Sequence, residues 1–164
     1  MSADPEPPAP STELRVVGTP PFSDALGVFA TVPIAAGSLI LLMSGELVPR
    51  PDRYSIQLSR DLHLRGSGSM ADELRHACEP NARVVGETPP PLHVVALRDI
   101  APGEEVTIDY CATEEVLSSP FACACGSSRC YGDVRGYRFL DEAQRARIAT
   151  RASPWLGRED VTAY

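Results

Sequence analysis

The sequence predicts a mostly β fold, and three observations support that prediction. Short apolar or alternating stretches recur along the chain, separated by turn residues. The 164 residues include 12 Gly and 16 Pro, which together make up about 17% of the chain against roughly 12% in average proteins. Only one stretch, near the C-terminus, has the pattern of a convincing helix. We therefore expect small β-sheets joined by many turns, with one terminal helix.

The elements follow in chain order. Residues 1–11 alternate proline with acidic residues, which predicts a disordered tail. Strands are expected at 12–17, 27–31, 38–43, 45–48, 54–58, 82–85, 92–97 and 105–108. A flexible Gly/Ser loop over 66–69 precedes one or two helical turns at 70–75.

The predicted helix covers residues 140–151. Asp141 and Glu142 stand at its start, whereas Arg145, Arg147 and Arg151 come later, an order that suits the helix dipole. We expect these arginines to be solvated.

Charge and hydropathy narrow the class of protein. The net charge of −7 argues against a nucleic-acid binder, which needs a cationic face, and suits a basic partner. The longest apolar run, residues 34–43, is interrupted by Gly37 and Ser38 and is too short to span a membrane. The N-terminus resembles no signal peptide. We therefore expect no nucleic-acid or membrane partner and a cytoplasmic location.

The five cysteines predict a metal site. Three of them fall in the run C-A-C-G-S-S-R-C, at Cys123, Cys125 and Cys130. The odd count and the lack of a secretion signal disfavour disulfides, and clustered thiolates suit tetrahedral Zn²⁺. The fourth position is open to Cys78, Cys111, His76 or water. With only three histidines in the chain, a closed structural Cys₄ site is favoured over a catalytic one.

Several segments together resemble the SET domain, the fold of most protein-lysine methyltransferases, followed by a post-SET zinc loop. They are 25–30 (ALGVFA), 43–46 (MSGE), 75–82 (RHACEPNA), 103–110 (GEEVTIDY) and, for the zinc loop, 123–132 (CACGSSRCYG). The resemblance covers about residues 12–136. It implies several small β-sheets with a pseudoknot, in which the segment ending in Tyr110 passes beside the loop holding His76 and Cys78. The implied boundaries are a SET domain at 12–118, a post-SET zinc loop at 119–136 and a C-terminal helical extension at 137–164.

The same resemblance implies S-adenosylmethionine (SAM)-dependent methylation of a lysine amine in a basic protein or peptide. Tyr110 matches the catalytic tyrosine of the family. The cofactor-binding residues would be Leu26, Gly27, Val28, Phe29, Arg75, His76 and Tyr131, and Phe121 is a second candidate for stacking on adenine. The substrate pocket would comprise Met43, Arg75, Ile108 and Tyr110. Cys78 would be the fourth zinc ligand beside Cys123, Cys125 and Cys130, which leaves Cys111 as a core residue.

Two positions depart from the family pattern and keep other functions open. Met43 replaces the tyrosine that lines the lysine channel, and methionine cannot donate a hydrogen bond. Arg75 replaces an asparagine that helps to hold the amino-acid end of the cofactor, and its charge could instead hold a carboxylate. One alternative is thus a SET-scaffold enzyme for a small molecule, either a methyltransferase or a SAM-independent cyclase or isomerase in a biosynthetic pathway. Another is a non-catalytic peptide-binding module.

Overall fold

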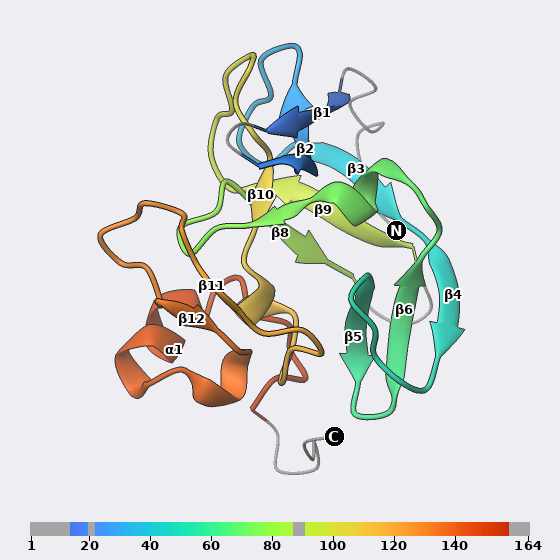
Figure 1. The fold of residues 1–164 in the computed structure, drawn as a ribbon, viewed down its shortest axis with the longest axis vertical. Coiled ribbons are helices and arrows are strands. Elements are labelled where there is room, and N and C mark those ends of the chain that lie inside the picture. Colours follow the sequence, from blue (N-terminus) through green and yellow to red (C-terminus); the bar gives the residue numbers. More distant parts are fainter. Residues whose placement is uncertain (1–13, 20–21, 87–90, 158–164) are drawn as a thin grey trace, which may run out of the picture.

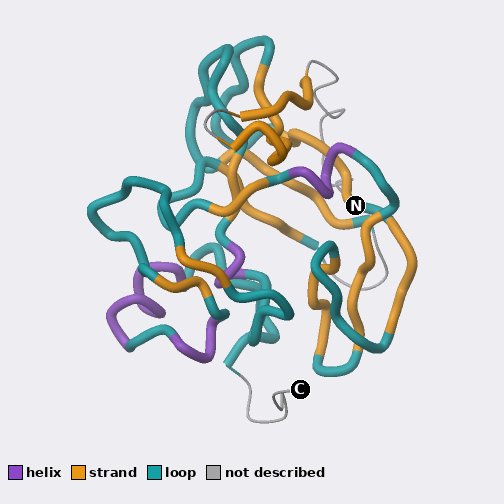
Figure 2. Tube along the Cα trace, in the orientation of Figure 1, coloured by secondary structure: helices purple, strands orange, loops and turns teal. Residues whose placement is uncertain are grey.

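The computed structural model describes residues 14–19, 22–86 and 91–157, and the predicted tail over 1–11 lies outside them. Strands and loops make up most of the described chain, together with three short 3₁₀ helices and one α-helix (Figure 2). The mostly β prediction is confirmed. Among the described residues, no helix is long and apolar enough to cross a membrane.

The elements have the following bounds. The strands are β1 (Leu14–Thr19), β2 (Phe22–Ala30), β3 (Leu39–Met43), β4 (Gly45–Val48), β5 (Ser55–Ser59), β6 (Leu62–Gly66), β7 (Arg75–His76), β8 (Ala82–Val85), β9 (Leu92–Ala96), β10 (Thr107–Ile108), β11 (Phe121–Ala122) and β12 (Asp133–Val134). The helices are η1 (Met70–Glu73), η2 (Tyr110–Ala112), η3 (Tyr137–Phe139) and α1 (Glu142–Ile148).

The strands form five small sheets. Three are two-stranded: the antiparallel pairs β1–β2 and β11–β12, and the parallel pair β10–β7. Two are three-stranded and antiparallel, in the orders β3–β9–β8 and β4–β6–β5. In Figure 1 the sheet β4–β6–β5 stands on the right, and β11, β12 and α1 lie together at the lower left. This arrangement agrees with the small-sheet architecture that the resemblance implied.

The sequence missed one central strand. Residues 66–69 were expected to be a loop and no strand was expected between 58 and 66, yet β6 lies there and pairs with both β4 and β5. His63 and Leu64, adjacent along β6, are both buried, so the strand does not show the alternation that reveals a half-buried strand.

The C-terminal helix is shorter than predicted. It begins after Asp141, whose side chain accepts the backbone N–H of Gln144 at 2.8 Å while Gln144 Oε1 accepts the N–H of Asp141 at 2.9 Å. This capping box fixes the first turn. The helix ends at Ile148, and the chain then turns so that the N–H of Ser153 donates to the carbonyl of Ala112 at 2.8 Å. A contact outside the helix thus ends it before residue 151.

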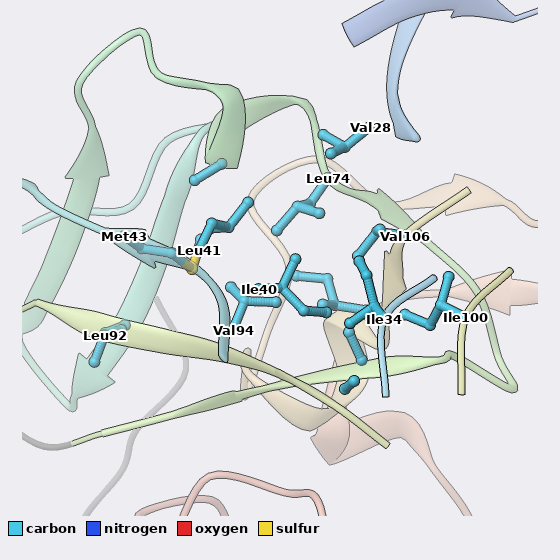
Figure 3. Packing of buried hydrophobic residues seen from close by; sticks show 14 of the residues in the cluster. Val28, Ile34, Ile40, Leu41, Met43, Leu74, Leu92, Val94, Ile100 and Val106 are labelled. Carbon is cyan, nitrogen blue, oxygen red and sulfur yellow. The ribbon is translucent and has the colours of Figure 1, made fainter. Parts of the chain in front are cut away.

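Two hydrophobic clusters make up the core. The larger one gathers apolar side chains from β2, β3, β8 and β9 and from the segments around Ile34, Leu74 and Val106 (Figure 3). The smaller one joins Cys111, Leu117 and Val134 with Ile148 at the end of α1. Tyr110 packs against both clusters.

Candidate functional site

Two segments far apart in the sequence meet at the parallel pair β7–β10. The N–H of Ala77 donates to the carbonyl of Ile108 at 3.0 Å, and the N–H of Tyr110 donates to His76 Nδ1 at 3.1 Å. The chain before Tyr110 therefore runs beside the loop that carries His76 and Cys78, as the resemblance implied.

Asn81 fixes the position of residues 105–107, which lead into this crossing. Its side chain is 2% exposed; it accepts the N–H of Thr107 at 2.9 Å and donates to the carbonyl of Glu105 at 2.7 Å. The N–H of Val106 also donates to the carbonyl of Val28 on β2 at 2.8 Å. Because the Asn81 amide accepts from one residue of this segment and donates to another, it fixes which backbone groups of the segment lie opposite Asn81.

Tyr110 is directed into the protein. Its hydroxyl donates to the carbonyl of Leu74 at 2.6 Å. Burial raises the pKa of this phenol to about 12, despite the opposing effect of the nearby Arg75. The hydroxyl is therefore protonated at neutral pH, when it can donate one hydrogen bond and accept others.

Four aromatic rings surround the crossing. The centroid of the His76 ring lies 5.3 Å from Tyr110, 5.8 Å from Phe121 and 6.0 Å from Tyr131. Tyr110 and Phe121 are 6.1 Å apart in an edge-on arrangement. Phe121 remains 38% exposed, so the cluster has one open edge. Exposed aromatic surface of this kind can accept a flat heterocycle.

His76 is neutral and serves as a bridge within the protein. Its Nδ1 accepts the N–H of Tyr110, and its Nε2 lies 3.2 Å from Cys78 Sγ, which assigns the ring proton to Nε2. Burial lowers the pKa of His76 to about 4. The imidazole thus connects the Tyr110 backbone to the cysteine cluster.

Arg75 forms an ion pair that the sequence did not reveal. Its Nε lies 2.9 Å from Glu105 Oε1, and both side chains are partly buried. Burial raises the pKa of Glu105, although Arg75 opposes that shift. The contact lacks hydrogen-bond geometry, and Oε1 accepts no hydrogen bond among the described residues. The ion pair therefore rests on charge attraction, and it offsets the charge of Arg75 beside β2.

The four cysteines predicted as zinc ligands converge. The sulfur atoms of Cys78, Cys123, Cys125 and Cys130 all lie within 4.8 Å of one another, and Cys78 Sγ is 3.7 Å from Cys123 and 3.9 Å from Cys130. A tetrahedral site with Zn–S bonds of about 2.3 Å requires sulfur separations of about 3.8 Å. The donor set and its spacing therefore fit zinc. Cys111, the other candidate, is buried in the smaller core cluster.

Asp109 connects the crossing to the C-terminal segment. Its side chain is fully buried, and Oδ2 accepts a bond from Tyr131 Oη at 2.6 Å and from Arg151 at 2.9 Å. The prediction that the C-terminal arginines are solvated is wrong for Arg151, which is 13% exposed. Because its partners lie 42 and 73 residues away, no local pattern could reveal this.

The other predicted residues occupy different environments. On β2, Leu26 is 42% exposed, whereas Gly27 and Val28 are buried and Phe29 is half-buried, forming a bridge to Glu105. Met43, at the end of β3, is 8% exposed and belongs to the larger core cluster, as does Ile108 on β10. Their cofactor and substrate roles remain predictions.

The sequence model of the SET domain matches residues 25–111. Histone-lysine N-methyltransferase ATX2 of Arabidopsis thaliana is 32% identical over 130 residues, which are 66% of this chain and 12% of that protein. The probable histone-lysine N-methyltransferase set-23 of Caenorhabditis elegans is 27% identical over 148 residues, which are 74% of this chain and 60% of that protein. The chain thus spans less than two thirds of the length of either relative.

Solved structures show the same fold at low sequence identity. The methyltransferase domain of human SETMAR aligns with a TM-score of 0.60 at 19% identity, over 73% of this chain and 56% of that chain. KRYPTONITE, solved with mCHG DNA and SAH, aligns with a TM-score of 0.60 at 23% identity, over 73% of this chain and 28% of that chain. Because that protein was solved with DNA, the comparison gives no support to the predicted exclusion of nucleic acid.

Proposed function

The chain belongs to the SET-domain family, and from that premise we propose that it is a SAM-dependent methyltransferase acting on a lysine amine of a basic protein or peptide. The observation that supports this most directly is the position of Tyr110. A partly buried, protonated phenol lies at the crossing of β7 and β10, with its ring centroid 5.3 Å from that of His76. The basic acceptor follows from the acidic net charge of −7.

The residues around the crossing fit SAM. The open edge of the aromatic cluster at Phe121 can receive the adenine ring. Arg75 is paired with Glu105, and this ion pair offsets the charge of Arg75 beside the proposed cofactor site. Glu105 thereby reduces the repulsion that an unpaired arginine would exert on the ammonium and sulfonium of SAM, which makes Arg75 compatible with the cofactor.

Bound SAM supplies an electrophilic methyl group on a sulfonium. The chain's own contribution is to position the acceptor and to keep it neutral. The Tyr110 hydroxyl can hold the lysine amine, since the phenol both donates and accepts. Apolar surroundings such as Ile108 disfavour the ammonium form and so lower the amine pKa. Holding the reactants in line can supply much of the acceleration.

Zinc in this proposal is structural. Cys78, Cys123, Cys125 and Cys130 provide four thiolates, which close a tetrahedral site and leave no position for substrate. The metal would hold the β11–β12 loop against the segment after β7, and thereby place Tyr131 and Phe121 beside His76.

Calorimetric titration of SAM and of S-adenosylhomocysteine (SAH) into the zinc-saturated protein is the first test. We expect micromolar binding of both, followed by transfer of a labelled methyl group to lysine-rich histones or peptides. Well-folded protein that binds neither compound would contradict the proposal.

The small-molecule alternative has lost part of its motivation. It rested on Arg75 as a holder of an anionic substrate, and Arg75 is paired with Glu105 at 2.9 Å. Met43 gives it no further support, because that side chain is buried in the larger core cluster.

A further inference from the structure

Arg151 connects the C-terminal segment to both chain segments that meet at the candidate site. Arg151 follows α1 and lies 40 residues beyond the SET-domain match, which ends at residue 111. One guanidinium nitrogen donates to the carbonyl of Cys78 at 3.1 Å and to Asp109 Oδ2 at 2.9 Å. These acceptors belong to the two segments that meet at the β7–β10 crossing.

We propose that Arg151 is a positioning residue of the SAM site, an inference that rests on the proposed function. It acts through Asp109, whose Oδ2 also accepts the Tyr131 hydroxyl at 2.6 Å. Asp109 in turn fixes the start of η2, because its Oδ1 accepts the N–H of Cys111 at 3.0 Å. Arg151 thus fixes the carboxylate that orients both the Tyr131 ring and the backbone at Tyr110.

Arg151 is the cation that Asp109 requires. A carboxylate that is 0% exposed needs a charged partner. His76 Nδ1 lies 3.8 Å from Asp109, but it accepts the N–H of Tyr110 and so carries no proton. Arg147, the other arginine nearby, has its guanidinium 5.1 Å from the centre of the Tyr131 ring and interacts with the Tyr131 hydroxyl, whereas Arg151 is the arginine that bonds Asp109 directly.

The geometry requires arginine rather than any cation. Arg151 bonds a carbonyl and a carboxylate on two different segments through one terminal nitrogen, whose two N–H groups lie in the guanidinium plane and so point in fixed directions. A lysine at this position can neutralise Asp109 but offers a single flexible ammonium. Arg151→Lys, which keeps only the charge, should therefore retain only part of the wild-type affinity for SAH.

The experiment measures SAH affinity by calorimetry on the zinc-saturated full chain. The variants are Arg151→Met, Arg151→Lys and Tyr131→Phe, together with each Arg151 change combined with Tyr131→Phe. Arg145→Met is the matched control, because Arg145 donates to the carbonyl of Arg138 and packs on Tyr137, away from Asp109. Thermal unfolding of each variant confirms that it is folded at the titration temperature.

We expect Arg151→Met to weaken SAH binding about tenfold, as for a typical coupling between sites, and Arg151→Lys to fall between it and the wild type. The loss should be much smaller in the Tyr131→Phe background, because the Tyr131–Asp109 bond that transmits it is absent there. Arg145→Met should bind SAH as the wild type does. If Arg151→Met does not fold, Arg151→Lys takes its place in the double-mutant cycle.

Two results would overturn the inference while leaving the proposed function intact: unchanged SAH affinity in folded Arg151 variants, or an equal loss with and without the Tyr131 hydroxyl. The second result would assign Arg151 a role in stability only. A wild-type protein that binds no SAH would instead refute the proposed function, and the inference with it.

Discussion

Tyr110 combines a structural and a proposed catalytic role in one side chain. Its ring packs against both core clusters, and its hydroxyl bonds to the carbonyl of Leu74. Tyr110→Phe keeps the ring and removes the hydroxyl, so we expect a cost of about 1 kcal/mol in unfolding free energy from the lost hydrogen bond. Methyl transfer should fall about 10²-fold, as when one positioned donor is removed.

Initial rates with labelled SAM, set beside SAH affinity, separate these effects. SAH binding should change little, because the hydroxyl is directed to Leu74 and the proposed acceptor rather than to the adenine. A phenylalanine variant that transfers methyl groups at the wild-type rate would remove Tyr110 from the mechanism.

The Arg75–Glu105 pair makes a prediction that depends on charge. Glu105→Gln leaves Arg75 without its carboxylate partner near the proposed cofactor site. SAM carries a sulfonium and SAH does not, so SAM affinity should fall more than SAH affinity, by about fivefold for one extra charge at partly screened distance. Arg75→Asn should act in the opposite direction and favour SAM.

Titrations of SAM and SAH into Glu105→Gln at low and high salt test whether the difference in affinity is electrostatic. The difference between the two ligands should shrink as salt rises, because exposed parts of the pair are screened. Equal losses of SAM and SAH in Glu105→Gln would show that Glu105 matters for shape and not for charge.

At the residue scale, the sequence predicted the zinc ligands but not the residues that form ion pairs at the site. The four cysteines were found from their local spacing and from a family pattern, and their sulfurs converge. Glu105 and Arg151 were missed as site residues, because an ion pair depends on the folded path of the chain. Arg151 belongs to a charge pattern that is equally typical of a solvated helix.

Among the elements, the join between β5 and the segment after η2 carries a buried carboxyl. Glu114 Oε1 accepts the N–H of Gln57 at 3.0 Å, and Gln57 Oε1 accepts the N–H of Glu115 at 3.1 Å. Burial raises the pKa of Glu114 from 4.5 to about 8. In the folded protein this carboxyl therefore keeps its proton at pH values where the unfolded chain has lost it.

The sign of the resulting pH dependence follows directly. Between pH 4.5 and about 8, the folded state binds more protons at Glu114 than the unfolded state, so stability falls as pH rises, by about 1.4 kcal/mol per pH unit at most. Above that window both states are ionised and the loss is complete. Glu114→Gln keeps the acceptor for Gln57 and cannot ionise, so it should lack this fall.

Urea unfolding of the zinc-saturated protein at pH 6 and pH 8.5 measures the difference between wild type and Glu114→Gln, which cancels the titration of the other groups. The variant should gain stability relative to wild type as pH rises. A gap that does not change with pH would show that Glu114 ionises normally in the folded protein.

The predictability of each element depended on the range of the contacts that form it. Residues 82–85 were predicted as a strand and form β8 with the same bounds, because the adjacent valines Val84 and Val85 favour a strand locally. The strand expected at 105–108 shrinks to two residues, since β10 exists only through its parallel partner β7. The two-residue strands β11 and β12 were also not predicted, because each is defined only by its pairing with the other.

For the molecule as a whole, the zinc ligands lie where the two core clusters approach each other. Cys78 follows β7, whose partner strand β10 carries Ile108 of the larger cluster, while the other three cysteines lie between β11 and β12, where Cys123 packs against the smaller cluster. Figure 1 shows β11, β12 and α1 grouped apart from β3, β9 and β8. A metal bound here would join the β11–β12 loop, beside the smaller cluster, to the segment that follows β7.

Zinc removal should therefore loosen the two parts unequally. With a chelator under reducing conditions, we expect hydrogen exchange to rise over residues 121–136 and around Leu117 and Ile148, while the β3–β9–β8 sheet stays protected. The larger cluster holds Ile40, Val94 and Val106, all fully buried, and needs no metal to exclude water. Cys130→Ser should reproduce the chelated pattern, whereas Cys111→Ala should keep its zinc.

Exchange that rose equally in both parts would mean that the two clusters unfold as one, and unchanged exchange would mean that the β11–β12 loop holds its place without the metal. The unequal pattern is expected because the smaller cluster buries fewer apolar side chains, so the free energy of metal binding makes up a larger share of its stability.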